Sequence, residues 1–266
     1  MSGAQTTTLE ARPLNLGRHE IWPPVVLAPM AGVTDLAYRT LCWEQGAGLC
    51  VNQMVSARGL AERHEATMKL AEVGPDEPIR SVQLYATRPE DTTEAVRWLI
   101  GELDVDHIDF NFGCPSRKVT RHGGGAALPA KPKLFAAIVN AAVTAAEGRP
   151  ISVKFRKGIS DDLLTFVESG RIAQDAGVAA VALHGRTAEQ LYSGRADWQA
   201  IGELKSNLQD IPVLGNGDIW IAQDATAMMQ ETGCDGVVIG RGCLGRPWLF
   251  RDLRALFNDE PLPGVP

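Results

Sequence analysis

Eight short apolar segments alternate with helix-like segments along this chain, and this alternation predicts an α/β fold of the TIM (β/α)8 barrel type. The apolar segments are continuous, as expected of parallel strands that are covered on both faces. Eight strand–helix units in about 235 residues match the usual size of such a barrel. An open, doubly wound sheet is disfavoured because no Gly-x-Gly-x-x-Gly motif follows the first strand.

The predicted strands are residues 25–28, 49–54, 81–85, 107–111, 151–155, 179–184, 211–214 and 236–239. The predicted helices are residues 35–45, 87–100, 131–146, 161–176, 197–206, 219–231 and 247–256. Helix starts are indicated by Thr34, by a capping box of Thr87 and Glu90, and by Ser160. Before the first strand, residues 14–22 predict a short hairpin with Gly17 at its turn.

Composition indicates a folded domain, because 45% of the residues are apolar and 22% are charged. We expect three parts. Residues 1–24 form an arm and the short hairpin, residues 25–258 form the barrel, and residues 259–266 form a Pro-rich tail.

Charge and cysteine usage exclude several classes of protein. The net charge is −6, which argues against a generally basic nucleic-acid binder but permits a local basic patch. The sequence shows no signal peptide and no apolar run of membrane-spanning length, so we expect a cytoplasmic protein without a membrane partner. The five cysteines form no Cys-x-x-Cys pair, so neither a zinc site nor a disulfide framework is predicted, and we expect no metal.

The stretch around Cys114 is the strongest candidate for chemistry. A buried strand ends here, Cys114 and Pro115 follow at once, and a basic loop leads to the glycines at 123–125. In parallel α/β proteins the active site lies at the C-terminal ends of the strands. A lone cysteine is often a small buried hydrophobe, so the other strand ends decide between these two interpretations.

Polar residues and glycines follow the other strands as well. The candidates at these ends are Pro29, Met30, Ala31, Gln83, Asn111, Lys154, His184, Asn216, Gly217, Asp218, Gly240 and Arg241. The last two loops of a TIM barrel commonly bind phosphate, and glycines there let backbone N–H groups approach phosphate oxygens. A buried Lys needs an acceptor, and the edge of a flavin ring offers such acceptors to Lys154, Gln83 and His184.

Ordered motifs make the chain resemble a known family. They are Ala28-Pro-Met-Ala-Gly-Val-Thr-Asp35, Val82-Gln-Leu84, Asp109-Phe-Asn-Phe-Gly-Cys-Pro115, Lys118-Val119, Lys154-Phe-Arg156, His184-Gly-Arg-Thr187, Gly215-Asn-Gly-Asp-Ile219 and Ile239-Gly-Arg241 continuing to Gly245-Arg-Pro-Trp248. In this order they resemble the tRNA-dihydrouridine synthases, and the bacterial DusB-like branch most closely. Phe112 departs from the Met that is frequent in that branch.

The resemblance implies an FMN-linked oxidoreductase barrel that reduces uridine in tRNA to 5,6-dihydrouridine, with NADPH as electron donor. The family's proton donor falls on Cys114. Its FMN contacts fall on Pro29, Met30, Ala31, Gln83, Lys154, His184, Asn216, Gly217, Asp218, Gly240 and Arg241. We expect Asn111 to bind the uracil edge, and Arg117, Lys118 and Arg186 to meet the RNA backbone.

Members of the family continue into a helical tRNA-binding domain, whereas this sequence ends at Pro266 in a Pro-rich tail. The expectation is therefore a barrel alone, with weakened tRNA binding. Two alternatives stay open at this point. The first is an FMN barrel that acts on a small pyrimidine or another enone, and the second is a flavin-binding remnant with impaired turnover.

Overall fold

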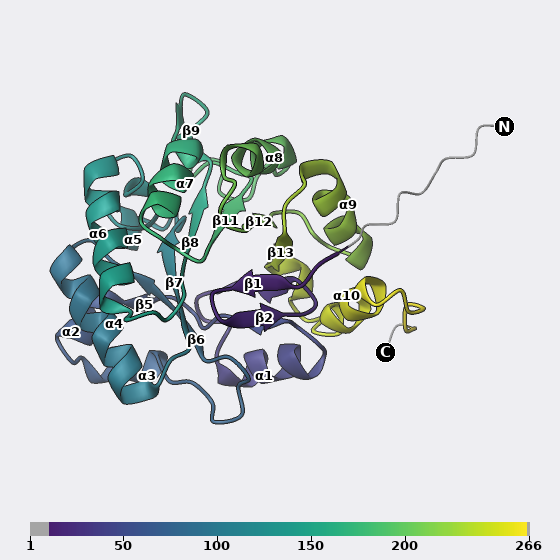
Figure 1. Cartoon of the computed structure of the whole chain (residues 1–266), viewed down its shortest axis with the longest axis horizontal. Coiled ribbons are helices and arrows are strands. Elements are labelled where there is room, and N and C mark those ends of the chain that lie inside the picture. The colour runs from purple at the N-terminus through teal and green to yellow at the C-terminus, as the bar shows by residue number, and fades with distance from the viewer. Residues whose placement is uncertain (1–10, 265–266) are drawn as a thin grey trace.

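Eight parallel strand positions form a closed barrel in the computed structural model, which describes residues 11–264 (Figure 1). The barrel strands are β3 (Val25–Leu27), β4 (Leu49–Cys50), β5 (Val55–Ser56), β6 (Ser81–Tyr85), β7 (His107–Phe112), β8 (Ile151–Arg156), β11 (Ala180–His184), β12 (Val213–Asn216) and β13 (Gly236–Ile239). Their order is β4-β3-β13-β12-β11-β8-β7-β6-β5. Because β4 and β5 are two ends of one segment, this order closes on itself, and the predicted TIM barrel is confirmed.

Helices surround the barrel and cover the outward faces of its strands (Figure 1). They are α1 (Leu36–Glu44), α2 (Ala57–Ala61), α3 (Glu65–Leu70), α4 (Pro89–Leu103), α5 (Arg117–Thr120), α6 (Pro132–Ala145), α7 (Phe166–Asp175), α8 (Trp198–Asn207), α9 (Ala222–Thr232) and α10 (Leu249–Phe257), with 3-10 turns η1 (Gly125–Ala127) and η2 (Arg241–Cys243). The short helices α2, α3 and α5 lie in segments for which the sequence predicted no helix.

Three predicted helix caps were wrong. Asp35, not Thr34, caps α1 by accepting from the backbone N–H of Tyr38 at 2.9 Å. The predicted box of Thr87 and Glu90 does not form, because α4 begins after Arg88, and Glu90 pairs with the Arg88 side chain. Ser160 belongs to an antiparallel hairpin of β9 (Gly158–Ser160) and β10 (Leu163–Leu164).

The second barrel strand is interrupted, whereas the sequence predicted one strand over 49–54. At the break, Asn52 donates from Nδ2 to the Leu70 carbonyl oxygen at 2.8 Å and accepts from Arg39 Nη1 at 3.0 Å. Arg39 is fully buried and also pairs with Glu77. These bonds turn the chain out of the ladder between β4 and β5.

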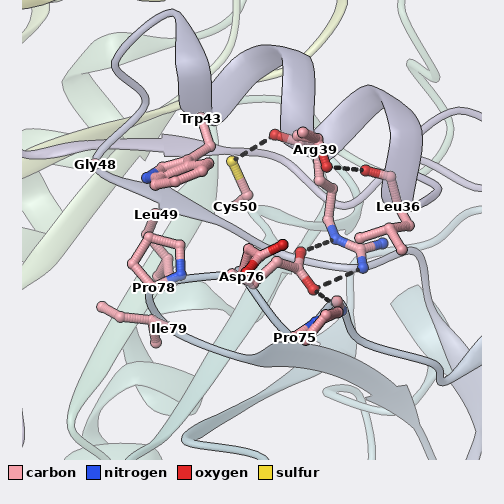
Figure 2. Close-up of a pocket in the computed structure, with 13 residues that line it drawn as sticks. Leu36, Arg39, Trp43, Gly48, Leu49, Cys50, Pro75, Asp76, Pro78 and Ile79 are labelled. Atoms are coloured by element: carbon pink, nitrogen blue, oxygen red, sulfur yellow. Dashed lines mark hydrogen bonds and ion pairs between the residues drawn. The ribbon is translucent and has the colours of Figure 1, made fainter.

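A small cavity of about 120 Å³ lies on the outer side of this break, between α1 and residues 74–79 (Figure 2). Its buried guanidinium, that of Arg39, is bonded to Glu77, to Asn52 and to backbone carbonyl oxygens. The cavity is therefore a mainly apolar hollow in which Arg39 and Glu77 already pair with each other.

The N-terminal hairpin lies across the barrel end where the strands begin, as Figure 1 shows. It consists of β1 (Leu14–Leu16) and β2 (His19–Ile21), with Gly17 at the turn as predicted. Its apolar side chains pack on inward-facing residues of the barrel such as Val26 and Leu214. The hairpin covers the barrel end where the strands begin, so the open end of the barrel is the one where the strands end.

The first ten residues of the predicted arm and the last two residues of the predicted tail lie outside the described residues. The barrel elements end with α10, after which residues 258–264 contain no helix or strand.

Candidate active site

A cavity of about 400 Å³ opens at the C-terminal ends of the barrel strands. The predicted residues that line it are Pro29, Met30, Ala31, Gln83, Asn111, Cys114, Lys154, His184, Asn216, Gly217, Asp218, Gly240 and Arg241. They come from seven of the eight strand positions, so the closure of the barrel brings together residues that lie up to about 210 positions apart in the sequence. The sequence-predicted set therefore shares one cavity.

The Cys114 loop is held from three sides. Asn111 Oδ1 accepts from the backbone N–H of Cys114 at 2.8 Å, and the Cys114 carbonyl oxygen accepts from the N–H of Ala126 at 3.0 Å. Arg156 Nε donates to the Gly113 carbonyl oxygen at 3.0 Å. Gly125 has φ +55°, and a Cβ there would lie 2.5 Å from the Cys114 carbonyl oxygen. Only glycine permits this approach, which fixes Cys114 at the cavity wall.

Lys154 and His184 form the electropositive floor of the cavity. Lys154 Nζ donates to Asn216 Oδ1 at 2.8 Å, and an ammonium has capacity for two further acceptors. Burial and, to a smaller extent, the nearby charge of Arg156 lower the pKa of Lys154 to about 8. Burial and the charge of Lys154 hold the pKa of His184 well below its usual range. At neutral pH the floor thus presents a charged ammonium beside a neutral imidazole.

The glycine loops after β12 and β13 form one wall. Gly217 has φ +126°, and a Cβ at this position would lie 2.5 Å from the Cβ of Ala196. At Gly240 a Cβ would make only an ordinary van der Waals contact, 3.8 Å from the Cβ of Ala28. Packing against Ala196 therefore requires glycine at 217, and both loops line the cavity, where Arg241 adds a positive charge.

Two aromatic residues at the cavity were missed by the sequence analysis. The Arg241 guanidinium lies 4.2 Å from the ring centroid of Tyr192 and 5.3 Å from that of Trp220. Both rings are exposed, and both line the cavity. Tyr192 follows the His-Gly-Arg-Thr motif by five residues, but its loop has no periodic pattern that would place it in advance.

Arg186 corrects one prediction. It was expected at the RNA backbone, but the structure buries it to 1% exposure. Its Nη2 contacts both carboxylate oxygens of Asp218, and its guanidinium also donates to the carbonyl oxygens of Ser193 and Gly194. A guanidinium buried and bonded in this way holds the loop after β11 and is not placed to meet a phosphate.

Asp218 lines the cavity as predicted, but its carboxylate accepts hydrogen bonds from other parts of the protein. It accepts from Arg186 and, at 2.7 Å, from the backbone N–H of Ala196. Its φ of +56° lies in the left-handed region. This side chain therefore joins the loops after β11 and β12.

Arg117 and Lys118 lie on α5, directly after the Cys114 loop, and both are exposed. Arg121 and His122 continue the same exposed segment. These cations lie on the segment that follows Cys114. They are exposed to solvent, so a polyanion could contact them without either charge being buried. They remain predicted RNA contacts.

Between residues 11 and 264 no group of three or more His, Cys, Asp or Glu side chains is arranged to hold a metal ion. Within the same range no helix combines the length and apolar character that crossing a membrane requires.

Comparison with known proteins identifies a family. The family model described as dihydrouridine synthase (Dus) matches residues 26–265. A "Probable tRNA-dihydrouridine synthase" of Mycobacterium tuberculosis strain H37Rv is 57% identical over 262 residues, which cover 95% of this chain and 67% of that protein. A "tRNA-dihydrouridine synthase B" of Xanthomonas axonopodis pv. citri is 41% identical over 256 residues, covering 94% and 75% of the two chains.

Solved structures with low sequence identity share the fold. Histamine dehydrogenase from Rhizobium sp. 4-9 has a TM-score of 0.62 at 14% identity, covering 93% of this chain and 48% of its own. The Amycolatopsis orientalis BexX/CysO complex contains a chain with a TM-score of 0.56 at 16% identity, covering 96% of this chain and 99% of that one.

Proposed function

The chain belongs to the dihydrouridine synthase (Dus) family, and we propose that it reduces uridine in tRNA to 5,6-dihydrouridine with FMN as cofactor and NADPH as electron donor. The observation that supports this most directly is the placement of Cys114. Its loop shares one 400 Å³ cavity with Lys154 and with the two glycine loops. A proton donor and a binding site for a phosphorylated, planar cofactor thus meet at the open end of one barrel.

The cavity residues fit FMN. The glycine loops at 215–218 and 240–242, with Arg241, would hold the phosphate, and Lys154 would bind acceptors of the ring edge. Lys154 supports this fit because its partly buried ammonium donates to Asn216 and keeps protons for further acceptors. Met30 and Pro29 add apolar surface on the opposite wall.

The chemistry of this chain's own residues is a proton transfer. When bound, FMN supplies the hydride for carbon 6 of the uracil ring. Cys114 supplies the proton for carbon 5, because a thiol carries a proton at neutral pH and can still release it. Asn111 lines the cavity beside Cys114 and donates one amide hydrogen to Gln83. Its second amide hydrogen would bind the uracil edge.

The substrate must present its base to this cavity from outside. A stacked base cannot enter a barrel mouth, so the target uridine leaves the stack of the tRNA before it reacts. The exposed cations Arg117 and Lys118 would meet phosphates next to that base. A free pyrimidine would need no such cations.

One experiment tests the proposal. The purified protein, loaded with FMN and reduced by NADPH, is mixed with unmodified tRNA, and flavin reoxidation and dihydrouridine are both measured in a single turnover. We expect both signals, and free uridine should give neither at the same concentration. A protein that binds no FMN, or that is reoxidised equally by free uridine, contradicts the proposal.

A further inference from the structure

A row of buried polar side chains runs through the barrel interior from its floor to the Cys114 loop. His107, Asp109 and Asn111 alternate along β7, so all three point into the barrel. Strand register places a polar residue beside each of them. The facing pairs are Ser81 with His107, Gln83 with Asp109, Ser152 with Asp109, and Lys154 with Asn111. The interior surface of β3 and β13, and that of β12 at Leu214, is apolar by contrast.

The upper part of this row is a continuous chain of hydrogen bonds. Gln83 Nε2 donates to Asp109 Oδ2 at 2.6 Å. Asn111 Nδ2 donates to Gln83 Oε1 at 2.8 Å. The backbone N–H groups of Cys114 and Gly113 donate to Asn111 Oδ1 at 2.8 and 3.2 Å. Four links therefore connect a buried carboxylate to the backbone of the catalytic loop.

This chain has a single polarity. An ionised carboxylate only accepts hydrogen bonds, so Asp109 must face the NH2 group of Gln83. At the other end the N–H of Cys114 only donates, so it must face the carbonyl oxygen of Asn111. Asp109 at one end and the N–H of Cys114 at the other therefore require the same orientation of the Gln83 and Asn111 amides. A flip of either amide would place one donor against another.

The surroundings of Asp109 keep its carboxylate available as an acceptor. Burial raises the pKa of Asp109 to about 6, while hydrogen bonds from Ser152 and Gln83 and the charge of Lys154 oppose that rise. Below it, Ser152 Oγ donates to Asp109 and lies 2.9 Å from His107 Nε2. Burial lowers the pKa of His107 to about 3, so this imidazole is neutral at physiological pH.

We propose that Asp109 is a positioning residue, which fixes the amide orientations of Gln83 and Asn111 and thereby holds the Cys114 loop in place. The inference rests on the proposed function only in assigning the proton transfer to Cys114. A buried carboxylate is costly unless it is bonded, and an apolar side chain of similar size would pack in the interior without that cost. The chain of bonds to Cys114 gives this carboxylate a role that packing does not.

The test compares Asp109→Leu with Asp109→Asn. Leu removes the acceptor for Gln83. Asn retains an acceptor for Gln83 and donates to Ser152, and the neutral His107 can then accept from Ser152 in its other tautomer. The first readout is alkylation of Cys114 by iodoacetamide in the protein without flavin. The other four cysteines are buried, so Cys114 reports alone.

We expect Asp109→Leu to be alkylated about tenfold faster than wild type, because a released loop exposes the sulfur, and Asp109→Asn to stay within about twofold. In turnover with tRNA, Asp109→Leu should lower kcat by on the order of 10–100-fold with KM within about twofold, as expected when a reacting group is misplaced. Asp109→Asn should restore most of kcat.

Ser152→Ala is the matched control, because it removes another partner of Asp109 and leaves the bonds toward Cys114 intact. It should be alkylated at the wild-type rate. If Asp109→Leu does not fold, Gln83→Leu breaks the same chain one link higher and should show the same faster alkylation.

The inference is overturned if Asp109→Leu and Asp109→Asn are alkylated at the same rate. It is also overturned if Ser152→Ala shows the same increase as Asp109→Leu. The alkylation assay needs neither flavin nor RNA, so it decides on Asp109 even if wild type fails to reduce tRNA. That second failure would count against the proposed function alone.

Discussion

Arg186 donates from Nη2 to both carboxylate oxygens of Asp218, at 2.8 and 2.7 Å, and this pair joins the loop after β11 to the loop after β12. The Arg186 side chain is 2% exposed and that of Asp218 is 19% exposed. The same guanidinium bonds to the carbonyl oxygens of Ser193 and Gly194. The segment that carries Tyr192 is therefore fixed from beneath by one buried cation.

Removing this cation should destabilise the protein. Arg186→Met keeps most of the stem but leaves the Asp218 carboxylate with only the N–H of Ala196 and the more distant Arg241 as partners. Breaking a buried pair in this way costs about 3–5 kcal/mol. We therefore expect the free energy of unfolding, measured by urea titration, to be lower by that amount. Arg195→Met, an exposed control in the same loop, should change the free energy of unfolding by less than about 0.5 kcal/mol. Equal effects of both changes would remove the assigned structural role.

Lys154 should control FMN affinity. Lys154→Met removes a charge-assisted donor worth about 1.5–3 kcal/mol, so FMN should bind about 10–150-fold more weakly, measured by quenching of flavin fluorescence. Cys114→Ala is the control and should bind FMN as wild type does. Retention of wild-type affinity by Lys154→Met would contradict its place at the flavin.

The pH dependence of FMN binding should carry the signature of the same lysine. Its pKa is lowered to about 8, so the ammonium is present at neutral pH and loses its proton as pH rises through that value. FMN affinity should therefore fall between about pH 7 and pH 9. Lys154→Met has no such proton to lose, and a flat profile for this variant is the internal check.

Much of the site could be predicted from the sequence because it follows from chain order. Apolar runs locate the strands, and a closed barrel then carries every strand end to one rim, which is why residues as distant as Met30 and Arg241 share the cavity. The burial of Arg186 could not be predicted in this way, because it depends on the carbonyl oxygens of Ser193 and Gly194. No local sequence pattern indicates where these two oxygens lie. Tyr192 was missed for the same reason.

The role of Asp109 had a signal that we did not use. Residues 107–111 predict a buried strand, yet polar residues occur at every second position, namely His107, Asp109 and Asn111. A period of two places these side chains on one face. That pattern marks a polar inner face, but only the register with β6 and β8 shows which partners satisfy it.

Replacing Asp109 should also reveal its cost to stability. Its pKa is raised to about 6 by burial, so the native state holds a proton that the unfolded state, with a pKa near 3.9, has lost. The free energy of unfolding therefore falls as pH rises through this window, by about 3 kcal/mol in total. Asp109→Asn should raise the free energy of unfolding at about pH 7.5, and the gain should be about 2 kcal/mol smaller at about pH 4.5. A gain that is the same at both pH values, in urea titrations, would exclude an ionised buried carboxylate.

The cations beside the Cys114 loop should set the salt dependence of tRNA binding. Each phosphate that a cation neutralises contributes about 0.7–0.9 to the slope of log K against log salt. Arg117→Ala and Lys118→Ala should each reduce that slope by about this amount, and Arg186→Met should leave it unchanged. Binding titrations over a range of KCl concentrations measure it. A smaller slope in Arg186→Met than in wild type would indicate that Arg186 contacts the RNA after all.

Cys114→Ala gives the most direct test of the chemistry. The loop is held by Asn111, Ala126 and Arg156 through backbone atoms of Gly113 and Cys114, so loss of the thiol should leave its path unchanged. FMN binding and flavin reduction by NADPH should therefore match wild type. Uridine reduction should fall by on the order of 10²–10⁴, the usual contribution of one general acid. Single-turnover flavin reoxidation by tRNA separates these steps, with Cys234→Ala, a buried cysteine outside the cavity, as control. An unchanged reoxidation rate in Cys114→Ala would assign the proton transfer to another group.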